Sequence, residues 1–220
     1  MNDVIKKQLL KRFNERLELI NNLRTKGIYD ENVLEVMLSI PRELFIPENL
    51  EDRAYDDNAL PIGENQTISQ PFTVAFMTQL LDVKKDNKIL EIGTGSGYQS
   101  LILSLLGAKV YSVERINILL ERAKKIFDLF EVNITTKIDD GSIGWKEFAP
   151  YDRIIITAAC PEFPNHLVDQ LNDNGKIVCP VGDKYLQKMY LGVKKNNNFE
   201  LKHFYEFKFV PLIGKYGWDE

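Results

Sequence analysis

Hydrophobic residues in the first part of the chain recur with the spacing of an α-helix. Over residues 4–26 apolar side chains return every three or four positions, which predicts one helix that Gly27 ends. A second, shorter helix is expected over residues 31–39, just before Pro41. Residues 42–71 show no such period and contain several prolines. We predict an ordered, largely irregular segment there, and a connection of that length is usually functional when it carries apolar residues.

From residue 73 onward, apolar strand-like runs alternate with helical patterns. Helices are predicted over residues 73–81, 98–106, 116–130 and 165–171, and strands over residues 88–92, 109–113, 133–138, 153–157 and 176–180. Strands over residues 188–193 and 199–207 are joined only by a turn and should pair as a hairpin. These elements predict an α/β fold with a doubly wound, mostly parallel sheet. The C-terminal hairpin is antiparallel, so the sheet as a whole is mixed. Ligands are expected at the carboxyl ends of the parallel strands.

Composition and charge argue against several classes of protein. The 220 residues are 44% hydrophobic and 27% charged, which suits one globular domain. The formal net charge of -4 argues against binding a nucleic-acid backbone. The longest uncharged run, residues 92–108, is interrupted by glycines and is shorter than the roughly 20 residues of a membrane span. We therefore expect neither a nucleic-acid partner nor a membrane partner.

Cysteines, histidines and the N-terminus bear on metal binding and location. Cys160 and Cys179 lie in apolar strand-like segments without a Cys-x-x-Cys spacing, so both are expected to be buried thiols. With only two histidines besides, we expect no metal site. The N-terminus carries charge where an export signal needs a continuous apolar run, so a cytoplasmic location is expected.

Glycine occupies alternate positions in the segment Glu91-Ile92-Gly93-Thr94-Gly95-Ser96-Gly97, between a predicted strand and a predicted helix. Glycines there let the backbone turn sharply and approach a ligand closely. A dinucleotide fingerprint would need its third glycine where this chain has Tyr98. The Gly-x-Gly-x-Gly form instead resembles the S-adenosylmethionine loop of class I methyltransferases. The alternative is a glycine-rich turn that binds nothing.

Carboxylates follow the next two predicted strands. Glu114 lies twenty-one positions after the first glycine of the loop, where a carboxylate can accept hydrogen bonds from both ribose hydroxyls of an adenosine group. The alternative is an exposed glutamate paired with Arg115 or Arg122. In a methyltransferase, Asp140 and Gly141 would border the adenine, and the alternative is a turn that aspartate and glycine favour.

Ser69 precedes a predicted helix in the segment Gln66-Thr67-Ile68-Ser69-Gln70-Pro71. Serine is a good N-cap and proline suits the first turn of a helix, so capping is one role for Ser69. A helix N-terminus also favours a bound carboxylate, so a substrate-binding role is compatible with capping.

Nine short segments occur in the order and spacing of protein-L-isoaspartate O-methyltransferases, and the chain resembles that family from about residue 38 to residue 218. Residues 66–71 are the most specific of them. Two positions depart from the family pattern, with Asp139 where glycine is usual and Cys160 where a small residue is common. The nine segments are Pro41-Arg42-x-x-Phe45-x-Pro47, Leu60-Pro61-Ile62-Gly63, Gln66-Thr67-Ile68-Ser69-Gln70-Pro71, Leu90-Glu91-Ile92-Gly93-Thr94-Gly95-Ser96-Gly97-Tyr98, Ser112-Val113-Glu114-Arg115, Asp140-Gly141, Thr157-Ala158-Ala159, Pro180-Val181-Gly182 and Phe209-Val210-Pro211-Leu212.

This resemblance implies a class I methyltransferase-like fold and transfer of a methyl group from S-adenosylmethionine to the free α-carboxylate of L-isoaspartyl residues in damaged proteins. It implies that Ser69, as the catalytic residue, orients that carboxylate. The implied cofactor-binding residues are Glu91, Gly93, Thr94, Gly95, Gly97, Glu114, Arg115, Asp140 and Gly141, and the implied substrate-binding residues are Thr67, Ile68, Gln70 and Pro71.

We expect a single domain that acts as a monomer on isoaspartyl-containing proteins and peptides. Residues 1–72 would form an N-terminal helical and substrate-loop extension, residues 73–208 the cofactor-binding core, and residues 209–220 a C-terminal tail.

Three other functions remain open at this point. The first is a methyltransferase that acts on a nucleic-acid base or a small molecule. Amine-methylating enzymes of this fold resemble one another in an Asn/Asp-Pro-Pro-aromatic segment, and this chain has Thr157-Ala158-Ala159-Cys160 there, which counts against that function. A catalytically inactive adaptor that binds S-adenosylmethionine and damaged proteins would have less reason to keep Glu114 and Ser69. A nicotinamide oxidoreductase is disfavoured by Tyr98.

Overall fold

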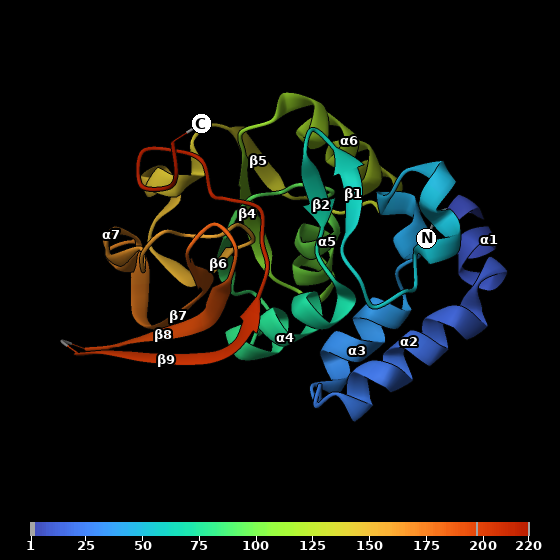
Figure 1. Cartoon of the computed structure of the whole chain (residues 1–220), viewed down its shortest axis with the longest axis horizontal. Coiled ribbons are helices and arrows are strands. Elements are labelled where there is room, and N and C mark those ends of the chain that lie inside the picture. The colour runs from blue at the N-terminus through green and yellow to red at the C-terminus, as the bar shows by residue number, and fades with distance from the viewer. Residues whose placement is uncertain (1–2, 197, 220) are drawn as a thin grey trace.

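Seven strands form the central sheet of the computed structural model, which describes residues 3–196 and 198–219 (Figure 1). Their order is β5-β4-β3-β6-β7-β8-β9, parallel as far as β7 and antiparallel from β7 to β9. This arrangement confirms the predicted fold class, including the C-terminal hairpin. The strands are β3 (Lys88–Ile92), β4 (Lys109–Glu114), β5 (Thr135–Ile138), β6 (Tyr151–Ile156), β7 (Leu171–Gly182), β8 (Gln187–Lys195) and β9 (Asn198–Phe207).

The order of strands along the chain reverses at β3. The chain runs outward from β3 through β4 to β5, and then returns to the other side of β3 with β6. Neighbouring loops leave the sheet in opposite directions at such a point, so a crevice opens at the carboxyl ends of the strands. The fold therefore places the loops after β3, β4 and β6 around one crevice.

Alternate residues of the strands point to opposite faces of the sheet, and each face has its own core. Ile89 and Val110 pack with α4 (Pro71–Leu81), α5 (Tyr98–Leu105), α6 (Asn117–Leu129) and the N-terminal helices. Leu90 and Ile92 pack on the other face with Trp145 and with the short helix α7 (Asn165–Val168). The second face is covered mainly by loops. Helix α7 is shorter than predicted because β7 begins at residue 171, five residues before the predicted strand.

The N-terminal pattern forms two helices instead of the one predicted. Helices α1 (Asp3–Lys11) and α2 (Phe13–Thr25) are separated at Arg12, whose backbone leaves the helical region. Arg16 is buried at this break, and its Nη2 atom donates to the carbonyl of Leu9 at 2.6 Å. The side chain of Arg16 thus satisfies the Leu9 carbonyl, which the break leaves without a backbone partner. Hydrophobic spacing alone does not reveal this contact.

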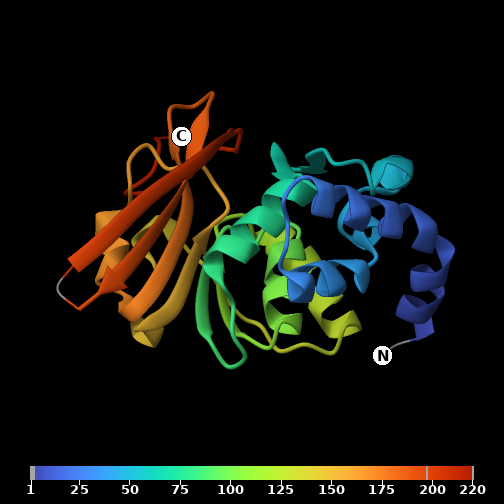
Figure 2. The same ribbon diagram turned by 90° about the horizontal axis from the view of Figure 1, so that it is seen from below.

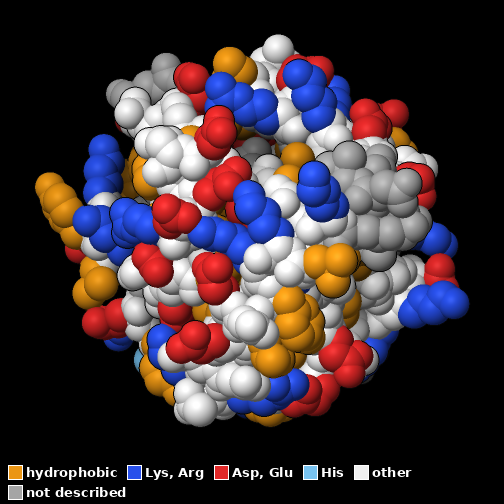
Figure 3. Space-filling model, turned by 90° about the vertical axis from the view of Figure 1, so that its right-hand side faces the viewer, with side chains coloured by type: hydrophobic (Ala, Val, Ile, Leu, Met, Phe, Trp, Pro, Cys, Tyr) orange, Lys and Arg blue, Asp and Glu red, His pale blue; other side chains and the backbone are white. Residues whose placement is uncertain are grey.

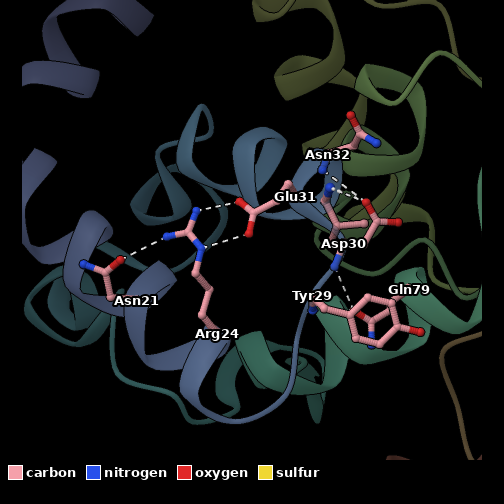
Figure 4. Close-up of polar contacts among 8 residues, drawn as sticks. Asn21, Arg24, Tyr29, Asp30, Glu31, Asn32 and Gln79 are labelled. Atoms are coloured by element: carbon pink, nitrogen blue, oxygen red, sulfur yellow. Dashed lines mark hydrogen bonds and ion pairs between the residues drawn. The ribbon is translucent and has the colours of Figure 1, made fainter.

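Helix α3 (Glu31–Leu38) is fixed at its start by polar contacts (Figure 4). The carboxylate of Asp30 caps it by accepting from the backbone N–H groups of Asn32 and Val33. Just before it, the side chain of Gln79 in α4 accepts from the backbone N–H groups of Tyr29 and Asp30 at 2.7 and 3.0 Å. These bonds join the N-terminal helices to the core.

The N-terminal helices lie at the end of the molecule opposite the β8–β9 hairpin (Figures 1 and 2). The face that they present carries acidic and basic side chains side by side (Figure 3). Interspersed charges of both signs do not build the continuous positive field that binds a phosphate backbone.

Residues 42–71 contain more regular structure than predicted. Two 3-10 helices, Arg42–Phe45 and Glu48–Arg53, precede an antiparallel hairpin of β1 (Leu60–Gly63) and β2 (Gln66–Ile68). The turn of this hairpin has positive φ at both Glu64 (+52°) and Asn65 (+56°). Two-residue hairpins favour turns with positive φ at both central residues. This hairpin was not predicted because strands of three or four residues are too short to show a clear hydrophobic period.

Candidate active site

The glycine loop lies at the carboxyl end of β3, beside the end of β6. Gly93 has φ of +95°, and a Cβ atom there would lie 2.4 Å from the hydroxyl oxygen of Thr157. That hydroxyl donates to the carbonyl of Gly93 at 2.6 Å. Both the backbone conformation and the close approach of Thr157 therefore require glycine at position 93.

The other two glycines of the loop differ in their surroundings. Gly97 has φ of +83° and packs on α6, where an added Cβ would lie 2.9 Å from the Cβ of Ala123 and 2.8 Å from a ring carbon of Phe127. Gly95 has φ of +54°, and the nearest atom to an added Cβ is the Cδ1 of Ile62 at 3.8 Å. Gly97 thus lets α5 begin close to α6, whereas a Cβ atom at Gly95 would make only an ordinary van der Waals contact.

Gly97→Ala is expected to lower the melting temperature more than Gly95→Ala. Both substitutions place alanine at positive φ, which costs about 1 kcal/mol. Only Gly97→Ala also pushes α5 away from α6, at a further cost of about 1 to 3 kcal/mol. Thermal unfolding of the two variants measures the difference, and equal melting temperatures would contradict the packing role of Gly97.

Glu114 joins the glycine loop to the end of β4. Its Oε2 atom accepts from the backbone N–H of Gly95 at 2.8 Å, and its Oε1 atom accepts from the N–H groups of Arg115 and Ile116 at 2.8 and 2.9 Å. A carboxylate has about four lone-pair positions, so three backbone bonds leave capacity for another donor. Glu114 is buried and also lines a cavity next to the glycine loop.

Glu91 and Thr94 lie beneath the loop. Glu91 is fully buried, and its Oε2 atom accepts from the hydroxyls of Ser100 and Ser112, while its Oε1 atom has no hydrogen-bond partner among the described residues. Burial raises the pKa of Glu91 to about 7, against the lowering effect of the two serine hydroxyls and with a smaller contribution from the charge of Glu114. Thr94 shares this cluster, since its hydroxyl lies 2.6 Å from that of Ser112. Neither side chain lines the cavity next to the loop.

The buried Glu91 carboxyl is expected to make the protein less stable as the pH rises from about 4.5 to about 7. The folded state keeps its proton up to about pH 7, whereas the unfolded state releases it near 4.5. The folded state therefore binds more protons across this window, and the free energy of unfolding falls by up to about 3 kcal/mol. Glu91→Gln cannot titrate, so it should gain stability relative to the unsubstituted protein between about pH 5 and about pH 8. Urea denaturation at both pH values measures this gain, and a pH-independent difference would contradict it.

The first cavity lies next to the glycine loop, at the carboxyl ends of β3, β4 and β6. It encloses about 100 Å³, less than the about 300 to 1,000 Å³ usual for small-molecule sites, so a nucleoside ligand requires one of its walls to move outward. Hairpin β1–β2 and the chain after β9 supply two of these walls. The lining residues are Gln66, Thr67, Ile92, Gly93, Gly95, Val113, Glu114, Arg115, Ile116, Gly141, Thr157, Ala158, Val210, Pro211, Leu212 and Ile213.

The turn after β5 borders this cavity through Gly141. A Cβ atom there would lie 2.7 Å from the Cγ2 of Ile92, so the close packing against β3 favours glycine. The carboxylate of Asp140 does not line the cavity and is bonded elsewhere: Oδ1 accepts from the N–H of Ser142 and Oδ2 from the N–H of Lys215, both at 2.8 Å. Asp140 thus ties this turn to the C-terminal segment.

The second cavity encloses about 530 Å³ and contains Ser69. Aromatic side chains from the start of α4 and from the end of β9 form much of its wall, and none of its lining residues is a histidine. The lining residues are Asn58, Ala59, Thr67, Ser69, Gln70, Phe72, Thr73, Thr157, Leu186, Tyr205, Glu206, Phe207, Lys208, Phe209 and Val210.

Ser69 is not the N-cap of α4. The helix begins at Pro71, and its N-cap residue is Gln70, which makes no side-chain capping bond. The carboxylate of Asp57 accepts from the N–H of Phe72 at 2.8 Å and so takes a first-turn donor that a bound carboxylate would otherwise use. The hydroxyl of Ser69 makes no hydrogen bond within residues 3–196 and 198–219 and belongs to the wall of the second cavity.

Thr67, Thr157 and Val210 line both cavities, so the two meet at these residues. Two other sequence-predicted substrate residues, Ile68 and Pro71, are buried outside both linings. Sequence reasoning assigned no role to residues 205–208 or 210–213. The only signal was the family-like segment 209–212, which carries no reactive side chain.

This strand order, the glycine loop after β3 and the carboxylate after β4 define a class I methyltransferase that uses S-adenosylmethionine. The family model for protein-L-isoaspartate(D-aspartate) O-methyltransferase matches residues 14–217. The chain belongs to this family, as its sequence motifs indicated.

Relatives and solved structures agree with the family. A protein-L-isoaspartate O-methyltransferase from Dictyoglomus turgidum is 49% identical over 207 residues, 94% of each chain. One from Chlorobium limicola is 48% identical over 207 residues, 93% of this chain and 95% of its own. A solved protein-L-isoaspartate O-methyltransferase has a TM-score of 0.83 at 28% identity and covers 92% of this chain and 67% of its own. A relative from Plasmodium falciparum, in complex with S-adenosyl-L-homocysteine, has a TM-score of 0.77 at 26% identity and covers 89% and 97%.

The described residues hold no metal-ligand cluster and no membrane-spanning helix. Over residues 3–196 and 198–219, no group of three or more His, Cys, Asp and Glu side chains could hold a metal ion. No helix within those bounds has the length and apolar character needed to cross a membrane. Cys160 and Cys179 are buried free thiols, which confirms that sequence prediction.

Proposed function

We propose that this chain transfers the methyl group of S-adenosylmethionine to the free α-carboxylate of L-isoaspartyl residues in damaged proteins and peptides. Membership of the family supports the reaction, and the observation that carries it is the meeting of the two cavities at Thr67, Thr157 and Val210. A methyl donor in the first cavity and an acceptor in the second face each other across these residues.

The residues that line the first cavity suit an adenosine group, which would enter once a wall has moved outward. Glu114 has acceptor capacity left for a ribose hydroxyl, and Gly93 and Gly95 line the cavity. Arg115 and Gly141 line the same cavity and are proposed to border the base. When bound, S-adenosylmethionine supplies an electrophilic methyl group on its sulfonium sulfur.

The remaining predicted cofactor residues support the site from outside the cavity. Glu91 and Thr94 hold the glycine loop from the core, and Gly97 lets α5 begin close to α6. Asp140 ties the turn after β5 to the C-terminal segment. We therefore assign these four residues to the shape of the cofactor site.

The acceptor carboxylate needs no general base. An α-carboxyl group has an ordinary pKa of about 3.3 to 3.7 and is ionised near neutral pH. The hydroxyl of Ser69, as a neutral donor, would orient this carboxylate without holding its charge so strongly that the ground state is favoured. Alignment of the reacting atoms can supply roughly 7 to 11 kcal/mol of the barrier.

Thr67 and Gln70 line the same cavity as Ser69 and are proposed as further substrate contacts. Ile68 and Pro71 anchor the segment between β2 and α4 instead, because both are buried outside the cavity. The wide, partly aromatic second cavity suits an extended polypeptide whose neighbouring residues vary.

We further propose a monomer built as one domain, since residues of a single chain line both cavities. Residues 1–72 contribute Ser69, residues 73–208 contribute the glycine loop, and residues 209–220 contribute walls of both cavities. A cytoplasmic location is proposed because free thiols persist in a reducing compartment. Sedimentation of the purified protein tests the oligomeric state.

Labelled methyl transfer tests the proposed reaction directly. The acceptors are an isoaspartyl peptide and its otherwise identical aspartyl twin, each incubated with the enzyme and methyl-labelled S-adenosylmethionine. Label is expected in the isoaspartyl peptide alone. Label in both peptides, or in neither, would contradict the proposed function.

A further inference from the structure

Arg42 is a fully buried arginine that reaches the backbone of Ser69. It opens the 3-10 helix Arg42–Phe45, and its Nη2 atom donates to the carbonyl of Ser69 at 3.0 Å. The guanidinium carbon lies 5.0 Å from the ring centroid of Tyr98, the first residue of α5. Arg42 therefore joins the segment that carries Ser69 to the helix that follows the glycine loop.

The buried position of Arg42 is costly. Its Nε and Nη1 atoms have no hydrogen-bond partner among the described residues. Burial lowers the pKa of Arg42, against the raising effects of nearby Tyr98, Asp57 and Tyr55. A buried charge with unmatched donors stabilises a fold less than an apolar side chain of similar shape would. Local stability does not explain an arginine here.

Arg16 shows what a structural buried arginine looks like in the same protein. It is equally buried, but all three of its donor nitrogens are used: Nε bonds the carbonyl of Leu38 at 2.7 Å, Nη1 the hydroxyl of Tyr55 at 3.0 Å and Nη2 the carbonyl of Leu9 at 2.6 Å. Among the described residues, Arg42 makes one such bond, and that bond ends on Ser69. Residues that break local rules without gain in stability tend to mark functional sites.

The segment that carries Ser69 is held on its other side by Asp57. The side chain of Gln70 donates to the carbonyl of Asp57 at 2.9 Å, and the carboxylate of Asp57 accepts from the N–H of Phe72. Ser69 thus lies between two anchors, with Arg42 fixing the peptide group that follows it.

We propose that Arg42 is a positioning residue for the reaction. Its bond to the carbonyl of Ser69 fixes the peptide plane between Ser69 and Gln70, and thereby the direction in which the Ser69 hydroxyl points into the second cavity. This inference rests on the proposed function, in which that hydroxyl orients the acceptor carboxylate.

Kinetics of Arg42→Met, Ser69→Ala and the double variant test this role. Methionine keeps much of the length and removes every donor. Arg42→Met should lower kcat on the isoaspartyl peptide by about tenfold, while the KM for S-adenosylmethionine changes by less than about twofold. If Arg42 acts through Ser69, the double variant should be within about twofold of Ser69→Ala alone. Arg42→Lys restores one donor and should recover part of the rate.

Arg16→Met is the matched control, because it removes an equally buried guanidinium far from Ser69 in sequence. It should lower the melting temperature but leave kcat unchanged once the concentration of competent enzyme is counted by titration with S-adenosylhomocysteine. Multiplying effects in the double variant would overturn the proposal. The same loss of kcat in Arg16→Met as in Arg42→Met would also overturn it.

Hydrogen–deuterium exchange separates this inference from the proposed function. Amides of residues 66–73 should exchange faster in Arg42→Met than in Arg16→Met, whether or not the enzyme methylates the peptide. Unchanged exchange in this segment would show that Arg42 does not hold it. If the unsubstituted enzyme transferred no methyl group to the isoaspartyl peptide, the proposed function would be wrong. The exchange data would still decide whether Arg42 fixes the segment that carries Ser69.

Discussion

Glu114→Ala is expected to weaken the binding of S-adenosylmethionine by about 10- to 100-fold. The carboxylate lines the first cavity and, in the proposed complex, accepts from a ribose hydroxyl. The three backbone bonds leave the carboxylate capacity for about one more donor, and a hydrogen bond to a charged group contributes about 1.5 to 3 kcal/mol. The substitution also releases the glycine loop, because the backbone N–H of Gly95 loses its acceptor. Calorimetric titration with S-adenosylmethionine measures the affinity.

Glu121→Ala serves as the control for this measurement. Glu121 is an exposed glutamate on α6 that pairs with Lys124 on the same helix. Its removal deletes a carboxylate of the same kind from the surface and should leave the affinity unchanged, since an exposed pair contributes little. A Glu114→Ala enzyme that binds the cofactor within about threefold of the unsubstituted protein would show that Glu114 serves only as an anchor for the loop.

Ser69→Ala is expected to lower kcat/KM for the isoaspartyl peptide by about 10- to 100-fold. One hydrogen bond from a neutral hydroxyl to a carboxylate is worth about 1.5 to 3 kcal/mol, and this value sets the range. The affinity for S-adenosylmethionine should change little, because Ser69 lies outside the first cavity. Steady-state kinetics with each substrate varied in turn separates the two effects.

Ser39→Ala is the matched control for Ser69→Ala. Ser39 follows α3, and its hydroxyl bonds to the carbonyl of Val36, away from both cavities. Its rate constants should equal those of the unsubstituted enzyme. If Ser69→Ala also retained the full rate, the hydroxyl would have no part in orienting the acceptor, and its place in the cavity wall would be incidental.

The central α/β elements were predictable because their patterns are local. Strands such as β3 and β4 are short apolar runs flanked by turn residues, and the alternating glycines after β3 mark a strand-to-helix connection. The early start of β7 was missed because residues 172–175 read as Asn-Asp-Asn-Gly, a typical turn sequence. The break at Arg12 depends on the buried Arg16, and no pattern of hydrophobic residues contains that information.

The candidate site was predictable where chemistry is tied to one short segment. Gly93, Gly95 and Glu114 line the first cavity and Ser69 lines the second, at positions that the motifs indicated. The placement of Glu91 under the loop depends on which face of β3 its side chain takes, and this follows from how α5 packs. The residues after β9 reach the cavities only through tertiary folding.

The shared wall of the two cavities bears on the order of events in turnover. In the proposed complex, the nucleoside in the first cavity and the polypeptide in the second would both contact Thr67, Thr157 and Val210. A chain seated there hinders exchange of the molecule below it. Catalysis should then run as a compulsory sequence, in which the methyl donor is loaded before the damaged protein and the esterified product departs before the spent nucleoside.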